Sequence, residues 1–213
     1  MALEYRIDVN RDDIDSAKRF FEFIGGNTKD VIRIAINRAG PTIRTAASSE
    51  IRRQIRLTAS YVRDRLTFSR ATRANLEGRI SAPKRGLLLS RFSTDALVAG
   101  EKVSWIKPPP VPPRGIRVKV KPTGAAKVVG GGDKIDGKPF FMVLPNSRAL
   151  AIVGRRADAG PRGGKIQVLY GPSLSQVFDD VAEDLTPQAA EVYARQQIDA
   201  MRYLLKKRSL PTS

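Results

Sequence analysis

The sequence predicts an α+β fold in which a mostly antiparallel β-sheet packs against a long helix in the N-terminal half, with a C-terminal helix and a mobile arm rich in proline and glycine. Apolar residues recur at helical spacing between residues 31 and 56 and again after residue 173, and short alternating segments typical of strands lie between them. At 213 residues we expect a single domain with one substantial core. Its expected segments are an N-terminal strand and helix (1–30), the long helix and a hairpin (31–100), a mobile basic arm (101–138), sheet strands (139–172) and C-terminal helices (173–213).

The first segment combines a strand pattern with a helix pattern. Apolar and charged residues alternate over residues 3–9, which predicts a half-buried strand. Asp12 is placed to begin a helix, and Gly25-Gly26 is expected to end it. Thr28 would then cap the next helix.

The second segment carries the strongest helical repeat of the chain. Its apolar positions recur in steps of four and three: Ile32, Ile36, Ala39, Ile43, Ala47, Ile51 and Ile55. Gly40-Pro41 is expected to bend this helix. A short helix near 60–66 and a hairpin of strands 66–72 and 76–82 should follow.

The third segment changes composition abruptly. It holds six prolines, six glycines and nine lysines or arginines, which favours an arm that becomes ordered only on a neighbouring molecule. Inside it, Ile116, Val118 and Val120 alternate with basic residues, which predicts a strand with one basic side. Gly130–Gly132 lacks the lysine and hydroxyl residue of a phosphate loop and is interpreted as a flexible hairpin tip.

The last segments return to regular structure. We expect strands at 140–144, 149–153 and 166–170, with a turn at Pro145–Ser147 and a stop at Gly171-Pro172. A capping-box pattern, serine followed three residues later by glutamine, opens the C-terminal helices at residue 173. The pair Thr186-Pro187 is expected to begin a new helix, since proline is favoured at the first helical position.

The charge of the chain points to an acidic partner. The net charge is +17, and residues 31–94 hold fourteen basic residues, thirteen of them arginine, against three acidic ones. Arginine suits bidentate contact with phosphates and carboxylates. The candidates for contact with DNA or a protein partner are Arg38, Arg52, Arg53, Arg56, Arg63, Arg65, Arg117, Lys119 and Lys121. Charge alone does not choose between a nucleic acid and an acidic protein surface.

Several classes of function are disfavoured by composition. The chain has no cysteine and no histidine, so it lacks the commonest metal ligands and proton carriers, and we expect no catalytic residue, metal or cofactor. The acidic pairs Asp12-Asp13, Asp179-Asp180 and Glu183-Asp184 are interpreted as helix starts rather than a nuclease site. No apolar run approaches the roughly 18 residues that span a bilayer, so we expect no membrane contact and residence in a cytoplasm-like space.

Seven short motifs follow one another in order along the chain: Ala35 to Ala39, Tyr61 to Arg63, Leu89 to Phe92, Ile116 to Val118, Phe140-Phe141, Arg155-Arg156 and Ile166 to Ser173. In these motifs and their order the chain resembles the prophage minor tail protein Z family, the tail completion proteins of long-tailed phages. It implies a structural virion protein without enzymatic activity, which completes the head-proximal end of the tail, in the neck region, and helps to join the tail to the head.

The resemblance also implies assembly in the host cytoplasm and a set of partners. These are other copies of the chain in a sixfold (hexameric) ring, a tail terminator or tail tube protein, the head–tail connector proteins and the end of the packaged double-stranded DNA. Apolar residues wide around the last helix, Ile198, Met201 and Leu205, are the candidates for contact between copies. The alternative that the composition leaves open is a non-specific nucleic-acid-binding protein, such as a packaging or ribosome-type factor.

Overall fold

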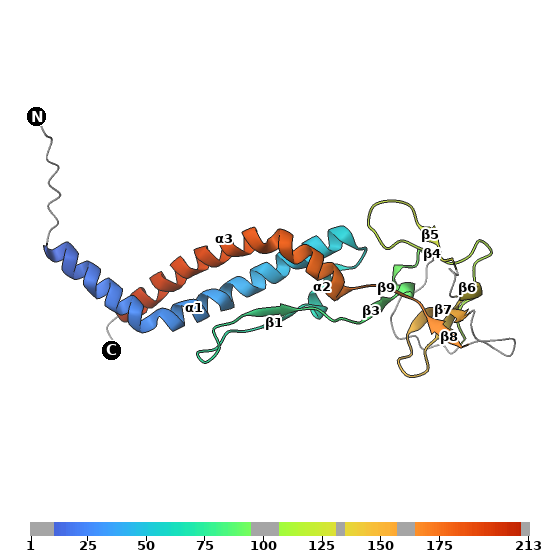
Figure 1. Cartoon of the computed structure of the whole chain (residues 1–213), viewed down its shortest axis with the longest axis horizontal. Coiled ribbons are helices and arrows are strands. Elements are labelled where there is room, and N and C mark those ends of the chain that lie inside the picture. The colour runs from blue at the N-terminus through green and yellow to red at the C-terminus, as the bar shows by residue number, and fades with distance from the viewer. Residues whose placement is uncertain (1–10, 95–106, 131–134, 157–164, 210–213) are drawn as a thin grey trace, which may run out of the picture. The chain divides into compact units, whose positions relative to one another are not determined.

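The α+β class is confirmed by the computed structural model of the chain, which describes residues 11–94, 107–130, 135–156 and 165–209. Two long helices come first and last, and short strands lie between them (Figure 1). The helices are α1 (Arg11–Gln54), α2 (Ala59–Arg65) and α3 (Leu174–Ser209), with a 3-10 turn, η1, at Leu89–Phe92. The expected strand at residues 3–9 lies outside the described residues.

The strands form small antiparallel sheets. They are β1 (Thr67–Ser69), β2 (Arg79–Ser81), β3 (Gly86–Leu88), β4 (Arg117–Val118), β5 (Lys127–Val128), β6 (Ile135–Val143), β7 (Leu150–Arg156), β8 (Ile166–Val168) and β9 (Tyr170–Ser173). The largest described sheet has the order β6-β7-β8, while β1-β2, β3-β9 and β4-β5 are pairs. The expected hairpin at 66–82 is thus confirmed with shorter strands, and so are the strands around the turn at 145–147.

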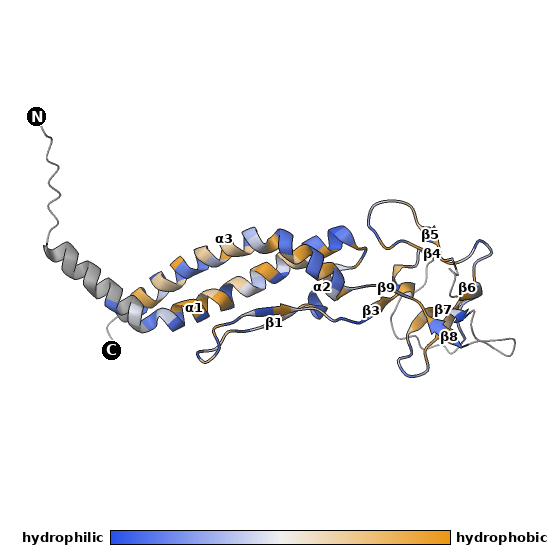
Figure 2. Cartoon of the chain, viewed as in Figure 1, coloured by the Kyte–Doolittle hydropathy of each residue, from blue (hydrophilic) through white to orange (hydrophobic). Residues whose placement is uncertain are grey.

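The chain divides into two compact units. The first comprises Met1–Ile43, Phe68–Ile80 and Thr186–Ser213, and the second comprises Arg44–Thr67 and Ser81–Leu185. Both α1 and α3 contribute residues to each unit. Polar and apolar residues alternate around both helices, as expected for helices that bury one side (Figure 2).

In the first unit, α1 packs against α3 and against the hairpin loop. Val31 and Ala35 of α1 form a small buried cluster with Ala200 of α3. Asn37 fixes the hairpin loop twice, because its side-chain amide donates to the carbonyl of Ala71 and its side-chain oxygen accepts from the amide of Ala71, both at 2.9 Å. Gly40 is required in α1, since a Cβ there would collide with the ring of Phe68.

The hairpin loop is also held by charge. The carboxylate of Asp30 accepts two hydrogen bonds from Arg73, at 3.0 and 2.7 Å, and two from Arg33, at 3.3 and 3.2 Å. Hydrogen bonding from Arg73, with Arg33 adding to it, lowers the pKa of Asp30 below its ordinary value. Asp30 therefore fastens the loop to α1. Thr28 does not cap a helix start as the sequence pattern suggested, because α1 continues through it.

In the second unit, the end of α1, the start of α3 and β7 share one core. Ile51 of α1, Leu150 and Ile152 of β7, and Leu174 of α3 are all fully buried there. Phe92 of η1 is buried against them as well. This is the expected packing of sheet against long helix.

Three expected breaks in regular structure are wrong. The helix continues through Gly25-Gly26, and α3 continues through Pro187. A glycine costs roughly 1 kcal/mol and an interior proline about 3 kcal/mol in a helix. Burial of other residues of the same helices, such as Ala35 of α1 and Val181 of α3, can offset these costs. Gly171-Pro172 does not end a strand either, because Gly171 and Pro172 belong to β9, which pairs with the short edge strand β3.

The capping box at Ser173 is confirmed: the amide of Gln176 donates to the Ser173 hydroxyl at 3.1 Å.

The described part of the expected mobile arm belongs to the second unit. Ile116 and Val118 are buried in its core, which confirms the alternation predicted for this strand. The amide of Lys119 donates to the carbonyl of Phe92, and the amide of Val129 donates to that of Ile116, both at 2.8 Å. Residues 107–130 are therefore part of the fold, and we revise the expectation of a free arm for them; residues 101–106 and 131–134 lie outside the described chain.

Candidate anion-binding site

The basic residues selected from the sequence are on the surface. Eight of the nine are exposed and Lys119 is half-buried. Within the described chain, Arg53 alone of the nine forms an ion pair, with Glu50 at 2.6 Å. The remaining eight cations have no described carboxylate to neutralise them, so they can bind external anions.

The fold brings two of the basic segments together. The backbone amide of Arg56, just after α1, donates to the carbonyl of Val120 at 2.7 Å. This bond joins the end of α1 to the basic strand predicted at 116–121. We call the cations of these two segments the basic cluster: Arg52, Arg53, Arg56, Arg117, Lys119 and Lys121.

The other selected residues lie elsewhere. Arg38 belongs to the first unit, where its guanidinium lies 5.0 Å from the ring centroid of Tyr203. Of the residues expected to contact other copies, Ile198 is 48% exposed and Leu205 is 37% exposed. Met201 instead packs partly against the buried cluster of the first unit, so it is only partly available for a partner.

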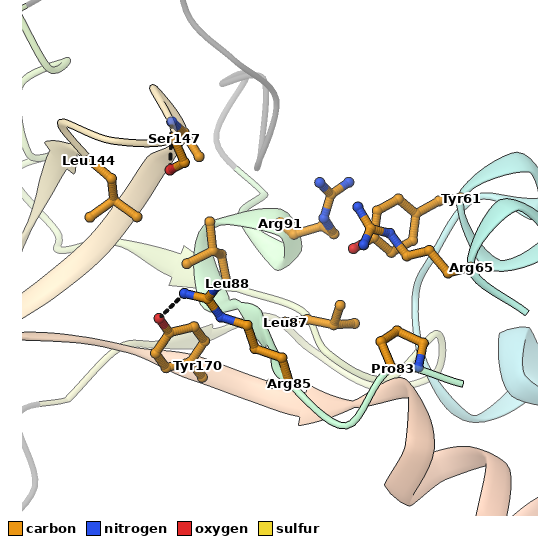
Figure 3. Close-up of a pocket in the computed structure, with 12 residues that line it drawn as sticks. Tyr61, Arg65, Pro83, Arg85, Leu87, Leu88, Arg91, Leu144, Ser147 and Tyr170 are labelled. Carbon is orange, nitrogen blue, oxygen red and sulfur yellow. Dashed lines mark hydrogen bonds between the residues drawn. The ribbon is translucent and has the colours of Figure 1, made fainter. Parts of the chain in front are cut away.

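A pocket of about 220 Å³ in the second unit collects further arginines around two tyrosines (Figure 3). Tyr61 and Arg65 come from α2, Arg85 precedes β3, Arg91 belongs to η1 and Tyr170 to β9. We call these five residues the tyrosine–arginine pocket. Leucines and the turn between β6 and β7 complete its wall, and no acidic residue is among the described lining residues.

Two guanidinium groups share the ring of Tyr61. The guanidinium carbon of Arg65 lies 4.3 Å from the ring centroid, and that of Arg91 lies 3.9 Å from it. Each contact is a cation–π interaction worth about 0.5–2 kcal/mol. The two guanidinium carbons are therefore within about 8 Å of each other, where like charges repel.

The third guanidinium belongs to Arg85. It donates a hydrogen bond to the Tyr170 hydroxyl at 3.3 Å (Figure 3). This hydrogen bond raises the pKa of Arg85 further above its already high ordinary value, so the group stays charged at any pH at which the protein is folded. Neither Arg65 nor Arg85 forms an ion pair with a described carboxylate.

The backbone around the pocket is fixed from the core. The hydroxyl of Ser90, itself buried, donates to the carbonyl of Leu150 at 2.6 Å and fastens η1 to β7. Leu88 of β3 pairs with Tyr170 of β9. Gly86 allows this approach, because a Cβ there would lie 3.0 Å from the Cβ of Tyr170. The charged ends of the arginines are thus carried by a rigid frame.

Comparison of the chain with protein-family models, curated proteins and solved structures gave no match. Function is therefore inferred from the residues, the geometry and the resemblance stated above. Over the described residues, no helix has the length and apolar character needed to cross a membrane. Nor does that part of the chain gather three acidic side chains into a possible metal cage.

The acidic pairs near the start of α3 need a different explanation from the one the sequence gave. Because α3 begins at Leu174 and runs through Pro187, Glu183 and Asp184 lie in the interior of the helix and not at a helix start. All four acidic side chains from Asp179 to Asp184 are exposed. They are solvated residues on the polar side of a long helix.

Sequence reasoning selected only one of the five pocket residues, Arg65. Arg85 and Arg91 belong to the basic stretch but were not selected, and Tyr61 was named only as part of a family motif. One sequence signal could have identified these pocket residues. Tyrosine and arginine recur close together in short segments that end in a helix or a turn. Only the pairing of β3 with β9 brings Tyr170 to the others, and no local pattern predicts that pairing.

Proposed function

We propose that this chain is a structural virion protein that completes the head-proximal end of a phage tail and helps to join the tail to the head. It acts by binding and has no catalytic role. The observation that carries the proposal is the excess of exposed arginines without carboxylate partners in the described chain, together with the family resemblance of seven ordered motifs. A junction protein needs such charge, because its neighbours include the end of the packaged DNA and acidic protein surfaces.

Contact between copies is the second element of the proposal. Ile198, Tyr203 and Leu205 expose much of their apolar surface on one end of α3. Apolar residues so placed are commonly covered by a partner. We propose that a second copy of the chain covers them in a ring, with sixfold order taken from the tail symmetry that the resemblance implies. A net charge of +17 opposes such association until an acidic neighbour offsets it.

The test is the position of the protein in the particle. Virions produced by the phage or prophage that encodes this chain are reconstructed by electron cryomicroscopy, with the protein carrying a small fused label. We expect label density in a ring between the tail tube and the head. One or two copies per particle, or density at the distal tip of the tail, would contradict the proposal.

The alternative function, non-specific binding of nucleic acid, is favoured by one specific observation. The bond between Arg56 and Val120 places two basic segments side by side, which extends the positive surface beyond one helix. We expect the purified protein to bind duplex DNA without sequence preference and to leave it uncut in the presence of magnesium or manganese. DNA binding with no protein in the virion would favour this alternative over the tail assignment.

A further inference from the structure

We propose that the basic, partly apolar end of α3 docks on the acidic first half of α3 in a neighbouring copy of the chain. The inference rests on the proposed function, because it names the surface that covers Ile198 and Leu205 between copies. The contact is heterologous, since two different surfaces of the chain meet. Repeated contacts of this kind close into a ring when the rotation between copies allows it.

The charges of α3 are separated along the helix. Residues 174–194 hold five acidic residues and no basic one, whereas residues 195–209 hold five basic residues and one acidic residue. A chain whose net charge is +17 thus carries an acidic surface of its own. That surface supplies the acidic neighbour that association between copies requires.

The docking patch consists of Ile198, Arg202 and Leu205. These positions are separated by four and three residues, so their side chains share one side of α3. Ile198 is 48% exposed and Leu205 is 37% exposed. The guanidinium of Arg202 lies 3.9 Å from the carboxylate of Asp199, a long ion pair that leaves the arginine side chain 77% exposed. The patch therefore offers a partner two apolar side chains and one accessible cation.

The acceptor surface consists of Asp179, Asp180, Glu183 and Asp184. All four side chains are exposed, and within the described chain none of them forms an ion pair. Their spacing of one, three and four residues places them on one side of α3. Val181, in the same turns, is buried in the core of the second unit, so the acidic side is held facing outward.

Charge complementarity selects the acceptor surface over a second docking patch. If two docking patches faced each other, the Arg202 side chains of both copies would meet and repel. Against the acceptor surface, Arg202 meets carboxylates while Ile198 and Leu205 are removed from water. At physiological salt, charges are screened beyond about 8 Å, so the charges at the contact outweigh the distant positive charges of the two chains.

The experiment measures the broadening of NMR signals in one copy by a nitroxide on another copy. The nitroxide is attached to Ala194→Cys, because the chain has no other cysteine and Ala194 is exposed about one turn before Ile198. The second copy is the unmodified protein, labelled isotopically for amide detection. At millimolar protein and about 0.15 M salt, we expect the strongest broadening at residues 179–187 of the labelled copy. Strongest broadening at residues 198–205 instead, or no broadening, would overturn the proposal.

Two charge reversals test the contact as a pair. Glu183→Lys in the isotope-labelled copy, or Arg202→Glu in the nitroxide copy, replaces an attraction by a repulsion, so either alone should weaken the association about fivefold. The two reversals together restore the attraction, and the broadening should return to within about twofold of that of the original pair. A combined reversal as weak as either single one would show that these surfaces do not meet.

Glu77→Lys and Arg63→Glu are the matched controls, because they make the same changes of charge at exposed positions outside both surfaces. Each should change the broadening less than about twofold. Effects as large as those of Glu183→Lys and Arg202→Glu would reduce the contact to a net-charge effect and overturn the proposal.

The docking proposal and the tail assignment fail separately, because the NMR measurement does not depend on where the protein lies in a virion. The contact found in solution, together with label density at the distal tip of the tail, would reject the tail assignment alone. A ring at the head-proximal end without this contact would reject the docking proposal alone.

Discussion

The basic cluster sets a quantitative expectation for DNA binding. Of its six cations, Arg53 is already paired with Glu50, which leaves five to neutralise phosphates. Each phosphate neutralised contributes a slope of about −0.9 in log K against log salt, so the five predict a slope of about −4.5. Affinity for duplex DNA should then fall about 500-fold between about 50 and 200 mM salt.

Replacing Arg117 and Lys121 by glutamine tests this count. Three cations remain, so the slope should fall to about −2.7 and the loss over the same salt range to about 40-fold. Fluorescence anisotropy with a labelled 20-base-pair duplex measures both slopes. Arg195→Gln with Arg202→Gln is the matched control, because it removes the same charge from arginines that are already paired with Glu191 and Asp199.

The reasoning is refuted by either of two results. If the Arg117→Gln, Lys121→Gln variant keeps the slope of the unmodified protein, these residues do not meet phosphates. If the control variant lowers the slope by the same amount, only the net charge matters and the cluster has no special role.

Three further predictions concern the fold. Ser90→Ala should lower the free energy of unfolding by about 1–3 kcal/mol in urea titrations, because the Leu150 carbonyl loses its buried donor, while Ser60→Ala on the surface should change it by less than about 0.5 kcal/mol. The amides of Lys119 and Val129 should exchange slowly with deuterium in the isolated protein, since both are hydrogen-bonded within the second unit. Exchange within seconds would show instead that these residues belong to a mobile arm. Because Arg73 lowers the pKa of Asp30, the contact between them should stabilise the protein at pH values above the ordinary aspartate pKa of 3.8. This stabilisation should be lost as the pH falls through the lowered pKa. In Arg73→Gln, the Asp30 pKa measured by NMR should rise toward the ordinary value.

Local sequence patterns were sufficient to predict most of the helices and strands and the basic character of the surface. The isoleucine repeat predicted the long helix, the alternation around Val118 predicted a strand with one basic side, and the Ser173–Gln176 pattern predicted a cap that the structure confirms. These features succeed because the buried side of an element and the cap of a helix depend on residues a few positions apart. The predicted breaks at Gly25-Gly26 and Pro187 were wrong because they, too, depended on local pattern alone. The free-energy cost of glycine and proline in a helix was counted without the tertiary packing that offsets it.

The sequence by itself determined the class of the fold, the positive charge and the absence of histidine and cysteine, because these depend on composition and on short-range periodicity. Tertiary structure alone decided that residues 107–130 belong to the second unit, that Arg56 lies beside Val120, and that Tyr61 and Tyr170 line one pocket with three arginines. The contacts join segments that are distant in the chain, such as Arg56 with Val120 and Tyr61 with Tyr170. They follow from the pairing of β3 with β9 and from the burial of Ile116. Both depend on how apolar residues from the whole chain pack into the core, and no local sequence motif specifies them.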